Sequence, residues 1–523
     1  MEPRINVFRG IMLDKEWTEI ARNIAKFCIE NYKLSLPDID FHIINAEELY
    51  SITATHGWIV YPQHWLIGQN YLVNKMEHEL GYTQIFEIVV PSGVSDKNIR
   101  EPVDAYIYDA STDVAKKLVI SHVYGHAHMF EVNPVEKKFK HESPRGFLAY
   151  ARKRLMELEQ EIGEEEVEKW MDIADSLSTL VDLYPMEEVK KVTEEKDFLS
   201  KLVETPEERR ERLEKELEEK TKKPEIPPKR NFDVMKFIID NSRNLTPQQR
   251  EILNLMYLIK RKEYSQALNH ILHEGFAALV NLKYGLDADL PIGEVFDWMK
   301  MTMGVASQPR DIRMIGANPY WLGMNLLLDV IDRWDKGKYG LEWENLTDLN
   351  LRREFNKKLN QGWDKVLEIT KTEDDYSFID NYFTKDFFDR EASHLLVFSG
   401  DEPKQGEREE DTYTIISRAY EDVKNTLLFR AYNAGLPRIA VEKGGGNYND
   451  NGELYLVQEL EGYEKLGITK GELTLDPEET KETLLKALYV AWGRRVHLET
   501  VDKEGNIIVI STYDGKNIEV KKK

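Results

Sequence analysis

The sequence comprises 523 residues, of which 41% are hydrophobic and 32% are charged, and it carries a formal net charge of −23. The hydrophobic share is enough for a sizeable core, and a chain of this length typically forms roughly two to four domains. An acidic surface repels phosphate groups, so the composition disfavours general binding to nucleic acid or to an anionic membrane.

The chain has a single cysteine, Cys28, which lies in an apolar helical pattern and is expected to be buried. One cysteine cannot form a disulfide within the chain, which is typical of proteins from a reducing compartment. Residues 1–6 lack the basic and apolar pattern of a secretion signal, and no apolar run reaches membrane-spanning length. We therefore predict a cytoplasmic protein without membrane insertion.

The first predicted elements come before a cluster of histidines in the sequence. Residues 12–32 have the periodicity of a helix, and residues 86–90 and 105–108 are predicted as short strands. A second helix is expected to begin near Ser111 or Thr112, because both residue types favour helix N-caps.

A highly charged stretch follows over residues 151–220, which are rich in Glu, Lys, Arg and Leu. The segment 205–208, Thr-Pro-Glu-Glu, has the residues of a capped helix start, and three prolines between residues 224 and 228 end the charged run. We expect a solvated helix and flexible connector over 201–230, separating residues 1–200 from a second half of the same core.

Residues 231–409 are predicted to be mostly helical, with further helix starts at Thr246 and at Asn318-Pro319. Residues 410–523 have a different character and form a small unit of strands and one helix. Its predicted strands cover residues 438–441, 454–457, 496–501 and 506–511, and its predicted helix covers residues 478–492. We predict an α+β fold with a mainly helical core, a few short strands and a small C-terminal α+β domain.

The segment His122-Val123-Tyr124-Gly125-His126 places two histidines four residues apart. On a helix their Cβ atoms stack about 5–6 Å apart, close enough for two imidazoles to hold one metal ion. Zincin peptidases have a Glu general base beside the first His, whereas this chain has Val123. Gly125 costs up to about 1 kcal/mol inside a helix, so we expect something large to approach the backbone there.

A third metal ligand has to come from elsewhere, and Glu274 on a later amphipathic helix is the best candidate. The neighbouring His273 points about 100° away from Glu274 around the helix, so the two cannot both aim at one ion without distortion. His128 and His273 lie beside the two motifs and are further candidate ligands. The alternative for all these histidines is burial in a core without any metal.

From about residue 60 onward the sequence resembles the SpoVR family, the stage V sporulation protein R-like proteins. The matching pieces are His64-Trp65 with Gly68 and Tyr71, 85–89, 104–107, His122–His126, 249–253, Glu274–Ala277, Asn318–Tyr320 with Leu322-Gly323, 377–379, Trp492–Arg494 and Val496–Thr500.

The resemblance implies a cytoplasmic protein linked to spore cortex formation, although relatives also occur in organisms that make no spores. It implies no particular reaction. Two positions depart from the family pattern, which has Trp where this chain has Phe276 and His where this chain has Asn281. The absence of that His weakens any scheme in which it serves as a ligand or an acid.

Three further residues are candidates for proton transfer. Glu87 and Asp104 belong to the two strands before the histidine helix, and either can orient an imidazole or replace the missing base. His64 precedes Trp65 and either serves an active site or packs beside that ring. Because strands alternate faces, Glu87 and Asp104 can instead point outward.

Two functions stay open at this point. One is a metal-dependent hydrolase with a zincin-like core, in which zinc or another divalent metal is held by His122, His126 and Glu274. The other is a non-catalytic regulator or scaffold that binds protein partners, which the Val at the base position favours. The sequence does not decide between them, and it leaves the substrate, the partners and the oligomeric state open.

Overall fold

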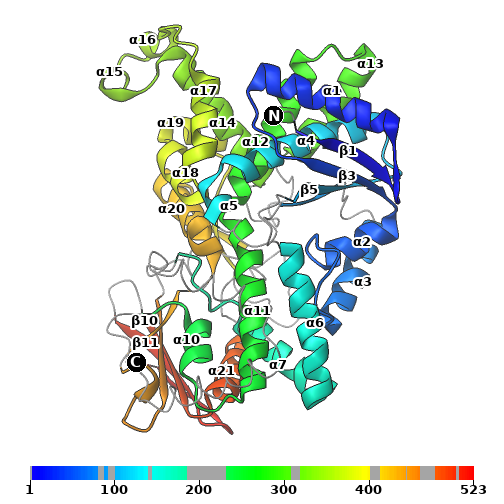
Figure 1. Ribbon diagram of the computed structural model, residues 1–523. Helices are drawn as coiled ribbons and strands as arrows, with labels where there is room; N and C mark the ends of the chain where they lie inside the picture. Colours follow the sequence, from blue (N-terminus) through cyan, green and yellow to red (C-terminus); the bar gives the residue numbers. More distant parts are fainter. Residues whose placement is uncertain are drawn as a thin grey trace. The chain divides into compact units, whose positions relative to one another are not determined.

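The chain forms two compact units, each assembled from two separate stretches of sequence: Met1–Phe147 with Gln266–Leu395, and Leu148–Ser265 with Leu396–Lys523. The computed structural model describes residues 3–79, 87–91, 101–138, 144–184, 231–307, 318–400, 413–436, 438–442, 444–459, 478–501 and 506–522 (Figure 1). The charged connector predicted over 201–230 lies outside these residues. The domain boundaries predicted from the sequence stay predictions.

The first unit contains a five-stranded sheet in the order β2-β1-β3-β5-β4. Its centre is parallel and consists of β1 (Ile5–Arg9), β3 (Ile39–Ile44) and β5 (Val103–Tyr108). The short strands β2 (Met12–Leu13) and β4 (Glu87–Val90) pair antiparallel at its edges. Sequence reasoning predicted β4 and β5, whereas it missed β1 and β3 and placed β2 inside a helix.

One face of this sheet is covered by α1 (Lys15–Tyr32) and α4 (Asp113–Val132), which contact each other (Figure 1). In the middle row of the sheet Phe41 pairs with Ala105, and both side chains are fully buried. The Phe41 ring lies edge-on to Tyr124 of α4, with 5.8 Å between the ring centroids. This face is therefore the apolar core of the first unit.

Helix α4 begins where the sequence predicted it. Thr112 is the N-cap, and its side chain accepts a hydrogen bond from the backbone N–H of Ala115. The helix follows β5 directly and runs through both histidines of the motif. Most of its side chains are buried, including Tyr124, whose hydroxyl donates to the carbonyl of Ala21.

Helix α12 (His270–Asp287) packs between α4 and α14 (Pro319–Lys336). Both contacts depend on glycine. A Cβ atom on Gly125 of α4 would stand 2.5 Å from the Cα atom of Ala277 on α12. A Cβ atom on Gly275 of α12 would stand 2.3 Å from the Cα atom of Gly323 on α14. The large group expected to approach Gly125 is therefore the backbone of α12.

The first unit contains eleven further described helices. They are α2 (Ala46–Ala54), α3 (Trp65–Glu79), α5 (Pro134–Lys138), η2 (Ala267–Asn269), α13 (Ile292–Val305), α15 (Gly340–Glu344), α16 (Leu349–Glu354), α17 (Gly362–Thr372), α18 (Asp375–Tyr382), α19 (Lys385–Phe387) and η3 (Phe388–Ala392). Among the described helices of the whole chain, none combines the length and the hydropathy needed to cross a membrane.

The second unit has a C-terminal sheet in the order β12-β11-β10-β9-β8. Its strands are β8 (Ile439–Val441), β9 (Leu454–Glu459), β10 (Val496–Val501), β11 (Ile507–Tyr513) and β12 (Ile518–Lys522). Helix α21 (Glu478–Trp492) contacts β10 and β11. The strands and the helix predicted between residues 438 and 511 are confirmed.

The other elements of the second unit are mainly helical. They are α6 (Pro144–Ile162), whose first turn belongs to the first unit, α7 (Glu164–Leu177), α10 (Val234–Asn241), α11 (Pro247–Gln266), β6 (Val397–Gly400), β7 (Tyr413–Ser417), α20 (Tyr420–Ala431), η5 (Tyr432–Gly435) and η6 (Gly445–Asn447). The protein is therefore α+β with a mainly helical core, as predicted. A zincin-like arrangement around α4 stays a prediction.

The contact between Gly125 and Ala277 gives a test of the fold. We expect Gly125→Ala to lower the free energy of unfolding by about 1–3 kcal/mol, because the added methyl group forces two packed helices apart. Urea denaturation followed by circular dichroism measures this change. The matched control is Gly293→Ala in α13, where a Cβ atom would meet no described atom within 4 Å. Equal stability of the two variants would contradict the close approach.

Candidate metal centre

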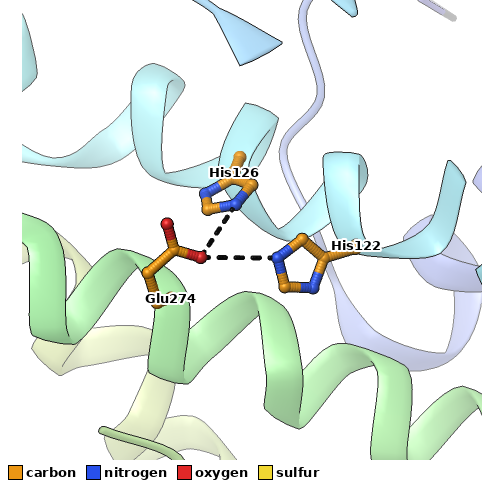
Figure 2. Close-up of side chains that lie close together, drawn as sticks. All are labelled: His122, His126 and Glu274. Atoms are coloured by element: carbon orange, nitrogen blue, oxygen red, sulfur yellow. Dashed lines mark ion pairs between the residues drawn. The ribbon is translucent and has the colours of Figure 1, made fainter. Parts of the chain in front are cut away.

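Two helices of the first unit bring three potential metal ligands together. Helix α4 presents His122 and His126 on one face because the two residues are one helical turn apart. Helix α12 presents Glu274 from its first turns, at the level where Gly125 and Ala277 touch. Figure 2 shows the carboxylate of Glu274 directed between the two imidazole rings.

The three side chains point their donor atoms at a common centre. Oε2 of Glu274 lies 3.5 Å from Nε2 of His122 and 3.4 Å from Nε2 of His126. One ligand atom from each residue lies within 4.8 Å of the others. Ligands held about 2.0–2.1 Å from a tetrahedral zinc ion stand roughly 3.3–3.4 Å apart, so the two measured distances fit such an ion.

Burial controls the electrostatics of this group. The side chains of His122, His126 and Glu274 are 4%, 10% and 15% exposed. Burial alone raises the pKa of the Glu274 carboxyl, but the charges and contacts of the two histidines hold it well below its usual range. Burial lowers the pKa of His122 although Glu274 opposes this shift, so the His122 imidazole is neutral near pH 7. An ionised carboxylate and a neutral imidazole are the forms that bind zinc.

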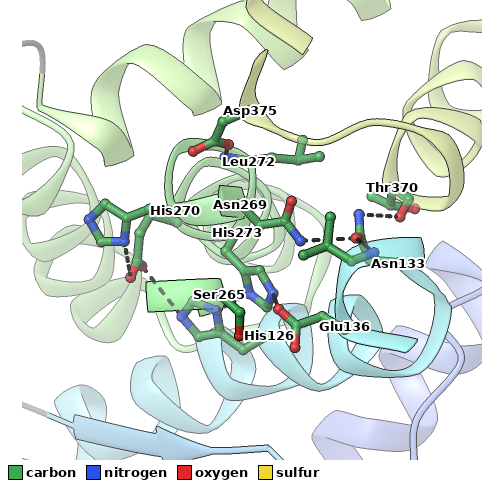
Figure 3. A network of polar contacts seen from close by, with 12 residues as sticks. His126, Asn133, Glu136, Ser265, Asn269, His270, Leu272, His273, Thr370 and Asp375 are labelled. Carbon is green, nitrogen blue, oxygen red and sulfur yellow. Dashed lines mark hydrogen bonds and ion pairs between the residues drawn. The ribbon is translucent and has the colours of Figure 1, made fainter. Parts of the chain in front are cut away.

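The ring of His126 also makes a second polar contact, which Figure 3 shows. Its Nδ1 atom forms a hydrogen bond of 3.0 Å with Nδ1 of His273, the residue before Glu274 on α12. On the far side of the His273 ring, Nε2 lies 3.3 Å from Oε1 of Glu136, a residue of α5. His273, a candidate ligand from the sequence, is therefore adjacent to a potential ligand, and its ring nitrogens face His126 and Glu136 instead of the common centre.

The other histidine of the pair is contacted by Asn281. Its amide group lies 3.1 Å from Nδ1 of His122, and it also contacts the hydroxyl of Ser121 at 2.5 Å. Asn281 is buried. The position where the family pattern has His thus holds a residue that orients His122 in this chain.

The start of α12 is fixed by a carboxylate from α18. Asp375 accepts hydrogen bonds of 2.8 Å from the backbone N–H groups of Ile271 and Leu272, which have no partner within the helix. Burial raises the pKa of Asp375 to about 8, although the two backbone donors act in the opposite direction. The cap holds the helical turn that carries Glu274.

The end of α4 is tied to the same region by Asn133 (Figure 3). Its side chain donates to the carbonyls of Thr370 and Glu373 and accepts a hydrogen bond from the side chain of Asn269. These contacts join the end of α4, the end of α17 and the start of α12. The side chains of His122, His126 and Glu274 therefore project from helices whose ends are held by hydrogen bonds.

His128, a candidate ligand from the sequence, lies away from this group. Its Nδ1 atom accepts a hydrogen bond from the backbone N–H of Ser35, and its Nε2 atom contacts the hydroxyl of Thr370 at 3.2 Å. Burial lowers its pKa to about 4. Both ring nitrogens of His128 thus form hydrogen bonds with other residues. His128 comes two residues after His126 on α4, so its side chain points in a different direction from that of His126.

Asp104 faces away from the histidine pair. Its neighbour on the strand, Ala105, points toward α4, and side chains alternate along a strand, so Asp104 belongs to the opposite face of the sheet. There its Oδ1 atom lies 3.0 Å from Nε2 of His42, and it forms an ion pair with Arg145. The structure therefore does not bring Asp104 to the candidate metal centre.

Of the two other candidates for proton transfer, only His64 has a described side chain. The backbone of Glu87 pairs with Ile107 at the edge of the sheet, and its side chain is outside the description. His64 precedes α3, and its ring lies 5.5 Å from the ring of Trp65. The packing of His64 beside Trp65 was one of the two alternatives left open by the sequence.

Sequence reasoning missed Glu136 and Asp375. Glu136 is one acidic residue among many in a charged segment, and no local pattern marks it. Asp375 begins a helix of its own but binds the first turn of α12, so only the tertiary fold reveals this contact. The Asn133-Pro134 pair did contain a detectable pattern, since Asn followed by Pro favours the end of one helix and the start of the next.

Comparison with known protein families gives one match. The family model described as "SpoVR like protein" matches residues 13–436. The chain is 25% identical over 339 residues to "Uncharacterized protein YcgB" of Escherichia coli (strain K12), a stretch that covers 61% of this chain and 63% of that relative. No solved structure matches.

The cap formed by Asp375 predicts how stability depends on pH. Its pKa in the folded protein, about 8, exceeds its unfolded value of 3.8, so its proton stabilises the fold at low pH and this stabilisation is lost as the pH rises through 8. We expect wild type to lose on the order of 2 kcal/mol relative to Asp375→Asn between pH 6 and pH 9. Urea denaturation across this range measures the difference. A constant difference would contradict a buried, titrating carboxyl.

Proposed function

Because this chain belongs to the SpoVR family and its motif histidines meet a carboxylate, we propose that it binds one divalent transition metal ion, zinc in the first place. His122, His126 and Glu274 are the proposed ligands. The observation that carries the proposal is the convergence of their donor atoms, within 4.8 Å of one another, from two separate helices.

The chemistry of the donor set supports a metal ion. Nitrogen from histidine and oxygen from a carboxylate are ordinary zinc ligands. Oε2 of Glu274 is buried and accepts no hydrogen bond of normal geometry from the described residues, although both imidazoles lie within 3.5 Å of it. A cation at the common centre supplies a partner for this oxygen and uses the lone pairs of both imidazoles.

The number of ligands favours a reactive site. Among the described residues the group has three donors, and catalytic zinc sites commonly have three protein ligands with a fourth position for water or substrate. Zinc bound there would supply activation of a water molecule and polarisation of a carbonyl oxygen. We propose metal-dependent hydrolysis of an amide bond, in a peptide or a related cell-wall amide, as the reaction class.

Proton transfer in such a reaction needs a group at the mouth of the site. His270 is the best placed described residue, because its side chain is 57% exposed and its Nδ1 atom lies 3.9 Å from Oε1 of Glu274. It is one helical turn before Glu274 and shares its face of α12. We propose His270 for the role that a Glu beside the first His has in zincin peptidases.

A second function is favoured by Val123, which occupies the position of that Glu and is fully buried. A side chain without a titratable group cannot act as a general base. The alternative is therefore a non-catalytic regulator that keeps the metal centre and binds protein partners. The link to spore cortex formation and the cytoplasmic location implied by the family belong to the proposal under either function.

Elemental analysis tests the metal centre. We expect the purified wild-type chain, loaded with zinc and dialysed, to retain about one equivalent, and His126→Ala to retain less than about a tenth, because two ligands seldom hold zinc. Glu274→Gln has nearly the same shape as wild type and is expected to lose zinc as well.

The matched control is His64→Ala, which removes an imidazole outside the group and is expected to keep its zinc. Circular dichroism confirms that each variant is folded. Wild-type protein that retains no transition metal after loading would refute the proposed function.

Hydrolysis is tested with zinc-loaded wild type, metal-free wild type and Glu274→Gln on a mixed peptide library and on cell-wall muropeptides. We expect cleavage by the zinc-loaded protein on the order of a hundredfold or more above the other two forms. Mass spectrometry of the products locates the cleaved bond. Full zinc occupancy without any cleavage would favour the regulator. Pull-down experiments would then recover the same protein partners with wild type and with a folded His122→Ala variant.

A further inference from the structure

A chain of polar side chains runs from the candidate metal centre to a carboxylate on a third helix. It starts at His126, passes through His273 and ends at Glu136 (Figure 3). The side chains of His273 and Glu136 are 9% and 11% exposed. Water therefore has little access to these contacts, and the side chains themselves decide the direction of the hydrogen bond between the two rings.

The first contact joins two Nδ1 atoms at 3.0 Å, so one ring must donate and the other must accept. If His126 donates, the proton of His126 is on Nδ1 and its Nε2 atom has a free lone pair. His273 then accepts at Nδ1, and in its neutral form it has its proton on Nε2. That proton faces Oε1 of Glu136, 3.3 Å away.

The opposite direction is disfavoured by Glu136. If His273 donates from Nδ1, its neutral ring has a lone pair on Nε2, and this lone pair faces the carboxylate oxygen of Glu136. An ionised carboxylate only accepts hydrogen bonds, so the two atoms repel each other. Glu136 thus selects the arrangement in which Nε2 of His126 is free of its proton.

The selected arrangement has a consequence on the other side of His126. Its free Nε2 lone pair faces Oε2 of Glu274 at 3.4 Å, so two acceptor atoms are held against each other. Only a cation between them, either a metal ion or an additional proton, relieves this repulsion. In this arrangement a positive charge between Nε2 of His126 and Oε2 of Glu274 is favoured.

We propose that Glu136 and His273 are positioning residues, which fix the ring orientation and the proton position of His126 so that its Nε2 lone pair points at the metal. The inference rests on the proposed function, since it assigns a support to one of the proposed ligands. Outer carboxylates that bind the second nitrogen of a ligand histidine act in this way in metal sites generally, and their loss weakens metal binding about 10- to 100-fold.

The test compares zinc affinity in wild type, Glu136→Gln and Glu136→Ala by competition with a chelating dye. We expect the dissociation constant to rise about 10- to 100-fold in Glu136→Ala and by a smaller factor in Glu136→Gln, whose amide oxygen still accepts a hydrogen bond. The control is Glu368→Gln on α17, which removes an equal charge from a side chain that is 58% exposed. Its affinity is expected to match wild type.

A second measurement separates positioning from a general structural effect. Visible absorption of the cobalt(II)-substituted proteins reports the ligand geometry, and we expect it to change in Glu136→Ala and to match wild type in Glu368→Gln. The inference is overturned if wild type binds zinc and Glu136→Ala binds it equally well with an unchanged cobalt spectrum. If wild type binds neither metal, the proposed function fails, and the role of Glu136 fails with it.

Discussion

The close approach of α4 and α12 is the constraint on which the rest of the candidate site depends. The backbones meet at Gly125 and Ala277, where no atom larger than hydrogen fits between them. At this separation the short side chain of Glu274 reaches the space between two histidines one helical turn apart. A wider separation would place the carboxylate in water and leave the imidazoles as ordinary core residues. A second close backbone approach occurs between α12 and α14, at Gly275 and Gly323, so α12 is tightly packed against a helix on each side.

Charge is concentrated inside this tightly packed region. Three histidines, Glu136, Glu274 and Asp375 lie within or beside the first turns of α12, and most of them are buried. Burial of so many titratable groups costs free energy unless each finds a partner of suitable charge. A fold that only needed stability would have apolar side chains there. Buried clusters of titratable groups are typical of binding and catalytic sites.

Local patterns in the sequence predicted those parts of the fold that local interactions determine. The N-caps at Thr112 and Asn318, the spacing of His122 and His126, and the C-terminal strands all follow from residues near one another in the chain. The parallel strands β1 and β3 were missed, although the alternation of buried residues along β3 was present in the sequence. Glu274 was chosen because it is a carboxylate beside histidines on an amphipathic helix, although nothing in that helix indicates which histidines it meets. The contacts of Glu136 and Asp375 arise only when distant segments fold together, so no single-sequence pattern contained them.

The division of the first unit into two stretches of sequence affects the order of its assembly. During synthesis the two motif histidines emerge in the first stretch, and residues 148–265 of the other unit follow before Glu274 is made. Domains generally fold as units as the chain emerges, so the first stretch must wait for a partner helix while it exposes the faces that α12 will cover. A truncated chain that ends before α12 lacks one of the three proposed ligands. The three proposed ligands can therefore meet only in chains whose synthesis has continued through the first segments of both units and into α12.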